Sequence, residues 1–393
     1  MEYDFSSLPE VVWVEVMSYL GFRDRYSLSL TCHTLHSVFS HPSLWKSAKI
    51  FLLGGTNNFG PCKTFMLKTS FKTIERFGTL FRDLTITISG HVKGVDSDSR
   101  SLLEHLAEHC CLESLTLEAG QMVSSFHIGG TKPNEQDLLA IVSLINKASR
   151  LKKISVISWP MYPDIFGKPE LNIFHAMMLN EKLKNLESLS LFWTKRDWSE
   201  LNPLLPSLEY TLRLVTNFKQ LTHLAVRAVM LDSDIMRELA ECGRAKMKLL
   251  QVFVSSRPLV SSPTQRQRLS FRDWVHLVLA CPQLQVEVVI MSPIRDEDLA
   301  DILNPRTPLT SVTFLKHSGC NDQLLTSLAN SYENTLKQFV CHCMMTDIDE
   351  SLLYLVTRCH QMEELVVTQA LKHETVAIIQ DLRRWNKLNL TKQ

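Results

Sequence analysis

Three short segments contain residue types that could support phosphate binding or hold a metal ion. Residues 55–60 begin and end with glycine, but a proline and a cysteine follow where a phosphate-binding loop needs a lysine and a hydroxyl residue. Cysteine and histidine occur together at 341–343 and again at 359–360, which offers nitrogen and sulfur ligands for zinc. The spacing matches no tetrahedral zinc motif, and Cys341 falls on an expected core position. We therefore expect core thiols, no metal and no cofactor.

Motifs for covalent or metal-assisted hydrolysis are also missing. The chain has no Gly-x-Ser-x-Gly and no His-Glu-x-x-His sequence. Its histidines and aspartates are scattered, and no catalytic triad can be assembled from them without geometry. We expect no catalytic residues and a protein that is not an enzyme. The alternative, an unrecognised hydrolase or transferase, would require a deep polar cleft with several ionisable groups.

Charge and composition exclude several classes of partner. The 42 basic and 41 acidic residues give a net charge of +1, without the basic excess of a nucleic-acid-binding protein. No window of about 18 uninterrupted apolar residues suggests a membrane span. The acidic start, Met1–Asp4, does not resemble a secretory signal, and the ten cysteines form no Cys-x-x-Cys pair. These features predict a protein of the cytoplasm, the nucleus or both.

One short phrase, apolar-x-x-apolar-x-apolar, recurs along most of the chain. Apolar residues two positions apart lie on one face of a strand, so each copy predicts a short strand. The spacing between copies ranges from 26 residues (Leu336 to Met362) to 39 residues (Leu112 to Leu151). One copy is degenerate, with Gln283 in its leading position and Val286, Val288 and Ile290 alternating after it. The leading residues are Phe81, Leu112, Leu151, Leu186, Leu221, Leu249, Gln283, Leu309, Leu336 and Met362.

Stretches with helical spacing of apolar residues precede most of these strands. A single strand–helix unit cannot bury its own apolar face, so neighbouring units must stack into a continuous core. This pattern predicts an α/β solenoid, a leucine-rich-repeat horseshoe of strand–helix units. A doubly wound α/β sheet also alternates strands and helices and remains the alternative. The clearest helical stretches are 101–109, 135–148, 232–242 and 322–329.

Departures from the regular repeat occur at two insertions and at the C-terminal end. Residues 159–170 contain three prolines, and residues 255–272 are rich in Ser, Arg, Gln and Pro, so both are expected to be loops. Residues 374–387 carry apolar side chains on one helical face. We expect this helix to cap the last repeat, because the end of a solenoid would otherwise expose its core.

The first 48 residues have a different pattern. Leu8 and Pro9 begin a predicted helix that Gly21 ends, Asp24 opens a second short helix, and residues 41–45 close the segment. A three-helix segment of this size is too short to bury all of its large apolar side chains. Those side chains therefore need a partner protein or must pack onto the first repeat.

This segment resembles the F-box, whose pattern runs from Leu-Pro through Tyr-Leu, Asp, Leu and Cys to Pro-Leu-Trp. The matching positions are Leu8, Pro9, Val16, Met17, Tyr19, Leu20, Asp24, Leu28, Cys32, Phe39, Pro42, Leu44 and Trp45. The resemblance implies docking on the Skp-type adaptor of a cullin–RING ubiquitin ligase. The residues expected to bind the adaptor are Leu8, Pro9, Val12, Val16, Met17, Leu20, Leu28, Leu44 and Trp45.

Together, the module and the repeats resemble the F-box/leucine-rich-repeat class. We expect a three-helix F-box at 1–48, a leucine-rich-repeat solenoid at 49–373, and a C-terminal capping helix and tail at 374–393. The resemblance implies a substrate receptor that presents an unknown target protein for ubiquitination and proteasomal degradation. A repeat scaffold that binds partners without directing ubiquitin transfer is the alternative.

The target is expected to bind the concave face of the repeats. Strand residues that flank the apolar triplets face this surface, and several of them are apolar without a need in the core. An error of one residue in the register would exchange core and surface positions. The candidate substrate-binding residues are Ile157, Phe192, Arg227, Phe253, Val289, Leu315, Val340 and Val366.

Overall fold

The computed structural model describes residues 8–53, 71–89, 97–119, 135–157, 172–192, 208–255, 269–294, 299–316, 318–343 and 348–392. The chain divides into two units. The first unit consists of residues 1–151, 159–161 and 167–182, and the second consists of 152–158, 162–166 and 183–393. Each is described by itself below. In the described residues, no helix combines the length and apolar character needed to span a membrane.

The first unit begins with a helical module made of α1 (Glu10–Ser18), α2 (Phe22–Ser29), α3 (His33–Phe39) and the 3-10 turn η2 (Pro42–Trp45). Proline stands just before α1 and opens η2, where a missing N–H costs no helical hydrogen bond. Gly21 does not end α1 in a left-handed conformation. Its φ is −65°, and it is the N-cap of α2 instead.

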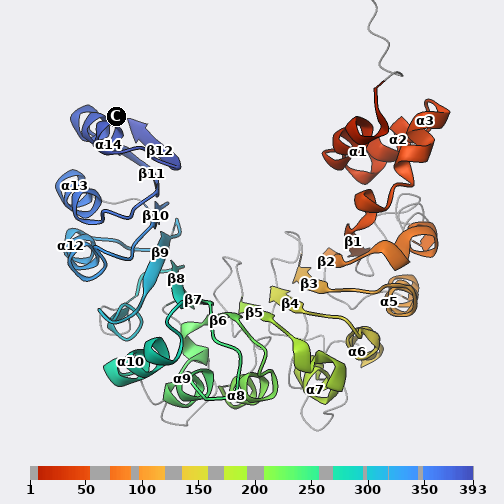
Figure 1. Cartoon of the computed structure of the whole chain (residues 1–393), viewed down its shortest axis with the longest axis horizontal. Coiled ribbons are helices and arrows are strands. Elements are labelled where there is room, and N and C mark those ends of the chain that lie inside the picture. Colours follow the sequence, from red (N-terminus) through yellow and green to blue (C-terminus); the bar gives the residue numbers. More distant parts are fainter. Residues whose placement is uncertain are drawn as a thin grey trace, which may run out of the picture. The chain divides into compact units, whose positions relative to one another are not determined.

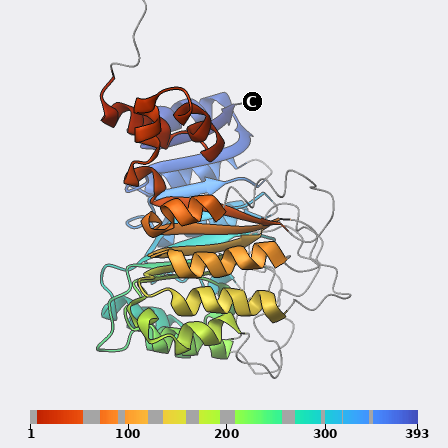
Figure 2. The same ribbon diagram turned by 90° about the vertical axis from the view of Figure 1, so that its right-hand side faces the viewer.

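Three strand–helix units complete the described part of the first unit (Figure 1). Strands β1 (Ser47–Leu53), β2 (Asp83–Ser89) and β3 (Ser114–Ala119) pair in parallel. The register aligns Ile50 with Ile86 and Ile86 with Leu117, and all three side chains are buried. Helices α5 and α6 pack side by side (Figure 2). The helical elements are residues 71–77, η4 (Gly78–Leu80), α5 (Ser97–His109), α6 (Glu135–Lys147) and α7 (Ile173–Leu179).

In the second unit, nine parallel strands pair in the order of the sequence. Each strand lies beside the next one along the chain, whereas the strand order of a doubly wound sheet reverses at its switch point. The arrangement is therefore solenoid-like. The strands are β4 (Lys153–Ile157), β5 (Ser188–Phe192), β6 (His223–Arg227), β7 (Leu249–Val254), β8 (Gln285–Ile290), β9 (Leu309–Phe314), β10 (Gln338–Cys341), β11 (Glu364–Leu371) and β12 (Lys387–Lys392).

Helices connect these strands and cover one side of the sheet (Figure 1). Polar side chains fix where several of them begin: Asp232 accepts from the N–H of Ile235 at 2.9 Å, and Asn321 accepts from that of Leu324 at 2.8 Å. The helical elements are η6 (Glu181–Asn185), which starts in the first unit, α8 (Leu208–Asn217), η7 (Ala228–Met230), α9 (Ser233–Leu239), α10 (Phe271–Ala280), α12 (Asp322–Ser331), α13 (Asp349–Arg358) and α14 (His373–Leu382).

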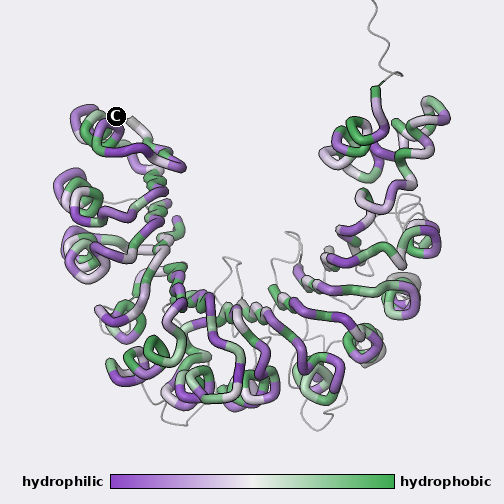
Figure 3. Tube along the Cα trace, in the orientation of Figure 1, coloured by the Kyte–Doolittle hydropathy of each residue, from purple (hydrophilic) through white to green (hydrophobic). Residues whose placement is uncertain are grey.

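The core of each unit lies between its strands and its helices. Along the strands, hydrophobic and hydrophilic residues alternate, as Figure 3 shows. Val252, Val288 and Val312 occupy aligned positions on β7, β8 and β9 and are fully buried, and Leu325 and Leu328 of α12 are buried as well. This is the continuous core that the repeated apolar phrase predicts.

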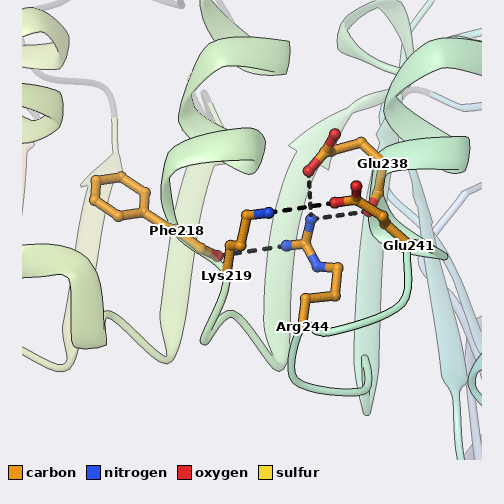
Figure 4. Close-up of polar contacts among 5 residues, drawn as sticks. All are labelled: Phe218, Lys219, Glu238, Glu241 and Arg244. Atoms are coloured by element: carbon orange, nitrogen blue, oxygen red, sulfur yellow. Dashed lines mark hydrogen bonds and ion pairs between the residues drawn. The ribbon is translucent and has the colours of Figure 1, made fainter.

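A buried arginine links two successive repeats of the second unit (Figure 4). The Arg244 guanidinium donates to the Glu238 carbonyl at 2.9 Å, to the Glu238 carboxylate at 3.3 Å and to the Phe218 carbonyl at 3.4 Å. Beside it, Lys219 forms an exposed ion pair with Glu241 at 3.5 Å. Burial lowers the pKa of Arg244, and the charge of Glu238 opposes that shift. The arginine thus satisfies carbonyl groups at the ends of two neighbouring helical segments.

All ten predicted strands are present, but three other predictions need correction. Leu249 is not a core residue; it lies on the opposite strand face, aligned with His223 and Gln285. Strands β1 and β12 were not predicted. The C-terminal helix ends at Leu382 instead of residue 387, and the expected tail contains β12, which pairs with β11. The expected loop at 159–170 lies outside the described residues, and so do residues 256–268 of the expected loop at 255–272. Phe271 and Arg272, at the end of that second segment, belong to α10 instead.

Candidate protein-interaction surfaces

Two aromatic residues anchor the helical module to the first repeat. The Trp45 ring stacks on Phe77 with centroids 3.9 Å apart and an interplanar angle of 6°. Its indole nitrogen donates to the Phe39 carbonyl at 2.7 Å, and the Phe39 ring meets Trp45 edge-on. Stacked and edge-on arrangements both suit the quadrupoles of aromatic rings. Trp45 therefore belongs to the internal packing of the first unit.

Arg25 holds the end of α1 against η2. Its guanidinium donates to the carbonyl oxygens of Met17 at 2.7 Å, Leu44 at 2.8 Å and Ser18 at 3.1 Å. Burial lowers the pKa of Arg25. Hydrogen bonds that involve a charged group typically contribute about 1.5–3 kcal/mol each to stability. Arg25 thereby fixes the relative placement of the module's first and last elements.

The assignment of Met17, Leu44 and Trp45 to the adaptor surface is wrong. Their exposed fractions are 0%, 4% and 4%, so they offer no free contact area. The alternative, packing within the module and onto the first repeat, is what the structure shows for them. The F-box pattern does not distinguish these two roles, because a large apolar residue suits a core and an interface equally well.

The opposite side of α1 and the adjoining α2 expose large apolar side chains. Val12 and Val16 are four residues apart and lie on one face of α1, and Leu8 is exposed just before the helix begins, whereas Met17 is buried. Tyr19 and Val11 are the most exposed, at 81% and 72%. We call this set the α1–α2 apolar surface: Leu8, Val11, Val12, Val16, Tyr19, Phe22, Tyr26 and Leu30.

Three of the predicted adaptor residues, Leu8, Val12 and Val16, belong to this surface, and Pro9 is exposed beside it. Leu20 and Leu28 are half-buried. The sequence prediction missed Val11, Tyr19, Phe22, Tyr26 and Leu30. Helical spacing could have identified Tyr19, which follows Leu8, Val12 and Val16 along the same face.

In the second unit, the strand face opposite the helices carries a row of polar side chains. The row runs through aligned positions on β7 to β11. Gln251 donates to the Glu287 carboxylate at 2.9 Å. Further along, Ser311 donates to Gln338 at 2.7 Å, and Gln338 donates to the Glu364 carboxylate at 2.8 Å. These side-chain hydrogen bonds connect neighbouring strands across this face.

An apolar row lies next to the polar one. Phe253, Ala225 and Met291 form a buried cluster, and Val289 and Leu315 pack against it. Arg227, aligned with Phe253, is also buried, and its burial lowers its pKa to about 10. A hydrogen bond joins the Arg227 guanidinium to the hydroxyl of Ser255.

Burial corrects half of the predicted substrate-binding residues. Arg227, Phe253, Val340 and Val366 are at most 8% exposed, so they are not a free apolar stripe. Ile157, Val289 and Leu315 are half-buried. Phe192 ends β5, but its side chain lies outside the described part of the chain. The polar row is half-buried as well, and its Ser311 is only 7% exposed.

The cysteines examined for zinc binding occupy the core. Cys341, Cys343 and Cys359 are each at most 1% exposed, which confirms that Cys341 fills a core position. The thiols of Cys341 and Cys343 lie 3.3 Å apart, and the hydrogen bond between them raises the pKa of Cys341 and lowers that of Cys343. Burial raises the pKa of Cys359 to about 12. The Gly-x-x-x-x-Gly segment at 55–60 lies outside the described residues.

Comparison with known proteins identifies the N-terminal module. Residues 5–50 match the F-box-like family model, so the chain carries an F-box-like domain there. The matched residues end at 50, and the leucine-rich-repeat assignment of the later residues stays a prediction. No match was found among curated proteins.

One solved structure illustrates how limited the similarity of the whole chain is. The chain is similar to a chain in the crystal structure of the TLR13–ssRNA13 complex, with 15% identity and a TM-score of 0.32. The match covers 74% of this chain and 39% of the chain in that complex, so this chain spans well under half the length of the solved one. A likeness at this TM-score supports no assignment of fold or function.

Proposed function

We propose that this protein is the substrate-recognition subunit of a Skp–cullin–F-box ubiquitin ligase. The F-box-like domain docks on the Skp-type adaptor, which brings the cullin and RING subunits. The observation that carries this proposal is the α1–α2 apolar surface, which lies within the residues that match the F-box-like model. Burying a large apolar side chain contributes about 1.5–3 kcal/mol, so this surface supplies a strong reason to bind a partner.

The strand face of the second unit is the proposed binding site for the target protein. Its polar row presents the half-buried amide and carboxylate groups of Gln251, Glu287, Gln338 and Glu364, and hydrogen bonds already fix their orientation. Pre-ordered side chains lose less conformational entropy on binding, which favours a specific protein partner. The protein itself supplies no catalytic group and acts by holding the target near the ligase. We place this activity in the cytoplasm, the nucleus or both.

The test is capture of the Skp-type adaptor by the full-length chain and by a variant of the exposed surface. Val12→Asp combined with Val16→Asp puts two charges on the α1–α2 apolar surface and leaves the buried residues of the module unchanged. Two unpaired carboxylates at the centre of an apolar interface are expected to weaken adaptor binding at least tenfold, or about 1.4 kcal/mol. Purified adaptor and surface plasmon resonance give the affinity.

A matched control carries the same change elsewhere. Leu279 on α10 and Ile378 on α14 are also exposed, at 75% and 51%. The Leu279→Asp/Ile378→Asp variant adds the same charge and should bind the adaptor like the unmodified protein. Equal affinities for all three proteins would contradict the docking role of the α1–α2 surface.

The ligase role is separated from a scaffold role by the fate of the captured target. A substrate receptor directs ubiquitin transfer, so target proteins should accumulate when the proteasome is inhibited and when the Val12→Asp/Val16→Asp variant replaces the original protein. Target levels that do not respond to either change would favour a repeat scaffold that binds partners without degradation.

A further inference from the structure

The last turns of α5, in the first unit, bring three potential metal ligands together. His105, Glu108 and His109 have the spacing i, i+3 and i+4, which places them on one face of the helix. One ligand atom from each side chain lies within 4.8 Å of the other two. This helix is far in sequence from the cysteine–histidine pairs considered for zinc, and the cluster contributes nothing to the proposed protein-binding surfaces.

The hydrogen bonding of His109 leaves a ring nitrogen suited to a metal. Its Nδ1 lies 2.9 Å from the carbonyl oxygen of His105. A carbonyl oxygen can only accept, so Nδ1 carries the proton and Nε2 keeps its lone pair. Metal-bound histidines are commonly oriented in this way by a hydrogen bond from the other ring nitrogen.

The second imidazole is held beside the first. The rings of His105 and His109 lie with centroids 4.0 Å apart, and Phe71 lies against His105 at 5.6 Å. Nε2 of His105 is buried and has no hydrogen-bond partner in the described part of the chain. A buried polar atom without a partner costs free energy, and a metal ion beside the pair would lower that cost.

Packing fixes the turn that carries these ligands. A Cβ added at Gly78 of η4 would lie 3.4 Å from the Cβ of His109 and 3.5 Å from the Cys110 sulfur. The backbone of η4 therefore approaches the end of α5 closely, and the absence of a side chain at Gly78 allows this. Ligands on a regular, packed helix lose little conformational freedom when they bind a metal.

Among the described residues, an ion pair of Glu108 competes with the metal ion. The ammonium group of Lys147, on α6, lies 3.5 Å from Glu108. Both side chains of this ion pair are about half exposed, at 47% and 57%, and exposed pairs contribute about 0–1 kcal/mol. A divalent cation can therefore replace Lys147 as the partner of Glu108 at small cost.

We propose that His105, Glu108 and His109 bind a divalent transition-metal ion of the zinc type. Two imidazole nitrogens with one carboxylate suit zinc, copper, nickel or cobalt, whereas magnesium and calcium prefer oxygen ligands. Three protein ligands leave the remaining coordination positions to water. The bound ion cross-links the last turns of α5 and stabilises the end of that helix. This departs from the sequence prediction of no metal site.

The experiment uses the untagged full-length protein and zinc alone, because a histidine tag would bind the metal itself. Competition with a chromophoric chelator measures the stoichiometry and the affinity. We expect one equivalent of zinc to bind, and we expect His105→Gln and His109→Gln each to lower the zinc affinity tenfold or more. His276→Gln, at an exposed histidine of α10, is the matched control and should not change this equivalent.

Lys147→Gln gives a test with the opposite sign. Because it removes the ammonium that competes for Glu108, it should strengthen zinc binding by about two- to fivefold, the range expected for an exposed pair. A variant that only disturbed the fold could not produce a gain. Unchanged zinc binding in a His105→Gln/His109→Gln double variant, or no bound equivalent in the original protein, would overturn the proposal.

Cobalt substitution tests the ligand set without relying on a variant. A site of two imidazoles, one carboxylate and water should give weak visible ligand-field bands. An intense near-ultraviolet thiolate-to-cobalt band would show that a cysteine is a ligand, and would refute the ligand set stated here.

Discussion

At the scale of single residues, Trp45 shows how a motif residue can have a structural role. It is buried, stacks on Phe77 and donates to the Phe39 carbonyl. Trp45→Ala should destabilise the first unit by about 3–5 kcal/mol, as expected for a large aromatic side chain removed from a core. Chemical denaturation followed by circular dichroism measures this loss.

The same substitution also abolishes adaptor binding if the module unfolds, so binding alone cannot locate the interface. Trp45→Phe keeps an aromatic ring beside Phe77, but it removes the indole hydrogen bond and part of the buried ring system. It should cost about 1–3 kcal/mol and retain adaptor binding at temperatures where the module is folded. A folded Trp45→Phe variant that loses the adaptor would instead place this residue at the interface.

Asp273 predicts a dependence of helix stability on pH. It lies in the first turn of α10 and accepts from the backbone N–H and the hydroxyl of Ser270 at 2.7 and 2.6 Å, and from Ser233 at 2.9 Å. Burial alone would raise its pKa, but these hydrogen bonds and the charge of Arg237 lower it. A carboxylate with a lowered pKa stabilises the fold above its unfolded pKa of about 3.9, and the effect disappears as the pH falls through the lower folded value.

Protection of the α10 amides should therefore decrease as the pH is lowered from about 5 to about 3. Asp273→Asn removes the titrating group, so its α10 protection should be lower at neutral pH and nearly independent of pH over this range. Hydrogen exchange resolved by residue measures both. Asp381→Asn, at an exposed position of α14, is the control and should behave like the original protein. Equal pH profiles for the Asp273 variant and the original would contradict the assignment.

At the scale of elements, arginines join the ends of successive helical segments. Arg244 donates to carbonyl groups near α8 and α9, and Arg383 donates to the carbonyls of Cys359 and Met362 beyond α13. Helix C-terminal carbonyls lack partners within their own helix, so a guanidinium with five donors can serve several of them. Each such arginine connects one repeat to the next.

The buried and the exposed cation of Figure 4 give a direct comparison. The side chain of Arg244 is fully buried, whereas that of Lys219 is 51% exposed. Arg244→Met leaves buried carbonyls and Glu238 without their donor and should destabilise the second unit by about 3–5 kcal/mol. Lys219→Met removes an exposed ion pair and should cost less than about 1 kcal/mol. Urea unfolding measures both, and similar losses would show that burial does not decide the contribution.

The strands were predictable from the sequence because their apolar alternation is local. Each of the ten predicted strands has buried residues at alternate positions, and this pattern indicates which face of the strand belongs to the core. Strand β1 (Ser47–Leu53) was not predicted: it spans the boundary at residue 48 between the predicted module and the solenoid, and the predicted strands begin only with the copy at Phe81. Strand β12 was not predicted because only two apolar residues, Leu388 and Leu390, alternate there. Neither of them is fully buried.

The functional surfaces were less predictable because they depend on contacts distant in sequence. Trp45 is buried by Phe77, which is 32 positions along the chain, and no spacing rule reveals that pairing. The burial of Arg227 and Phe253 likewise comes from other parts of the second unit. The ligand cluster on α5 differs, since its spacing is local. The sequence prediction missed this cluster because its order is His-x-x-Glu-His, which differs from the His-Glu-x-x-His motif of metal-dependent hydrolases.

At the scale of the whole molecule, stacking of repeats determines how a local change spreads. In a solenoid each repeat contacts mainly its neighbours, so stability is approximately a sum of local terms. In the second unit, β12 pairs with β11 and packs against α14. Loss of β12 should therefore affect those two elements first and the distant β6 to β8 hardly at all.

A truncation after Arg383 tests this directly. It removes β12 but keeps the arginine that donates to the carbonyl of Cys359, so the end of α13 stays satisfied. Hydrogen exchange should show a loss of protection in β11 and α14, because β11 becomes an edge strand with unpaired backbone groups. Amides of β8 and β7, four and five strands from β12, should keep the protection they have when β12 is present. A uniform loss over all strands of the second unit would show that it unfolds as one cooperative body, and the nearest-neighbour description of the repeats would then be wrong.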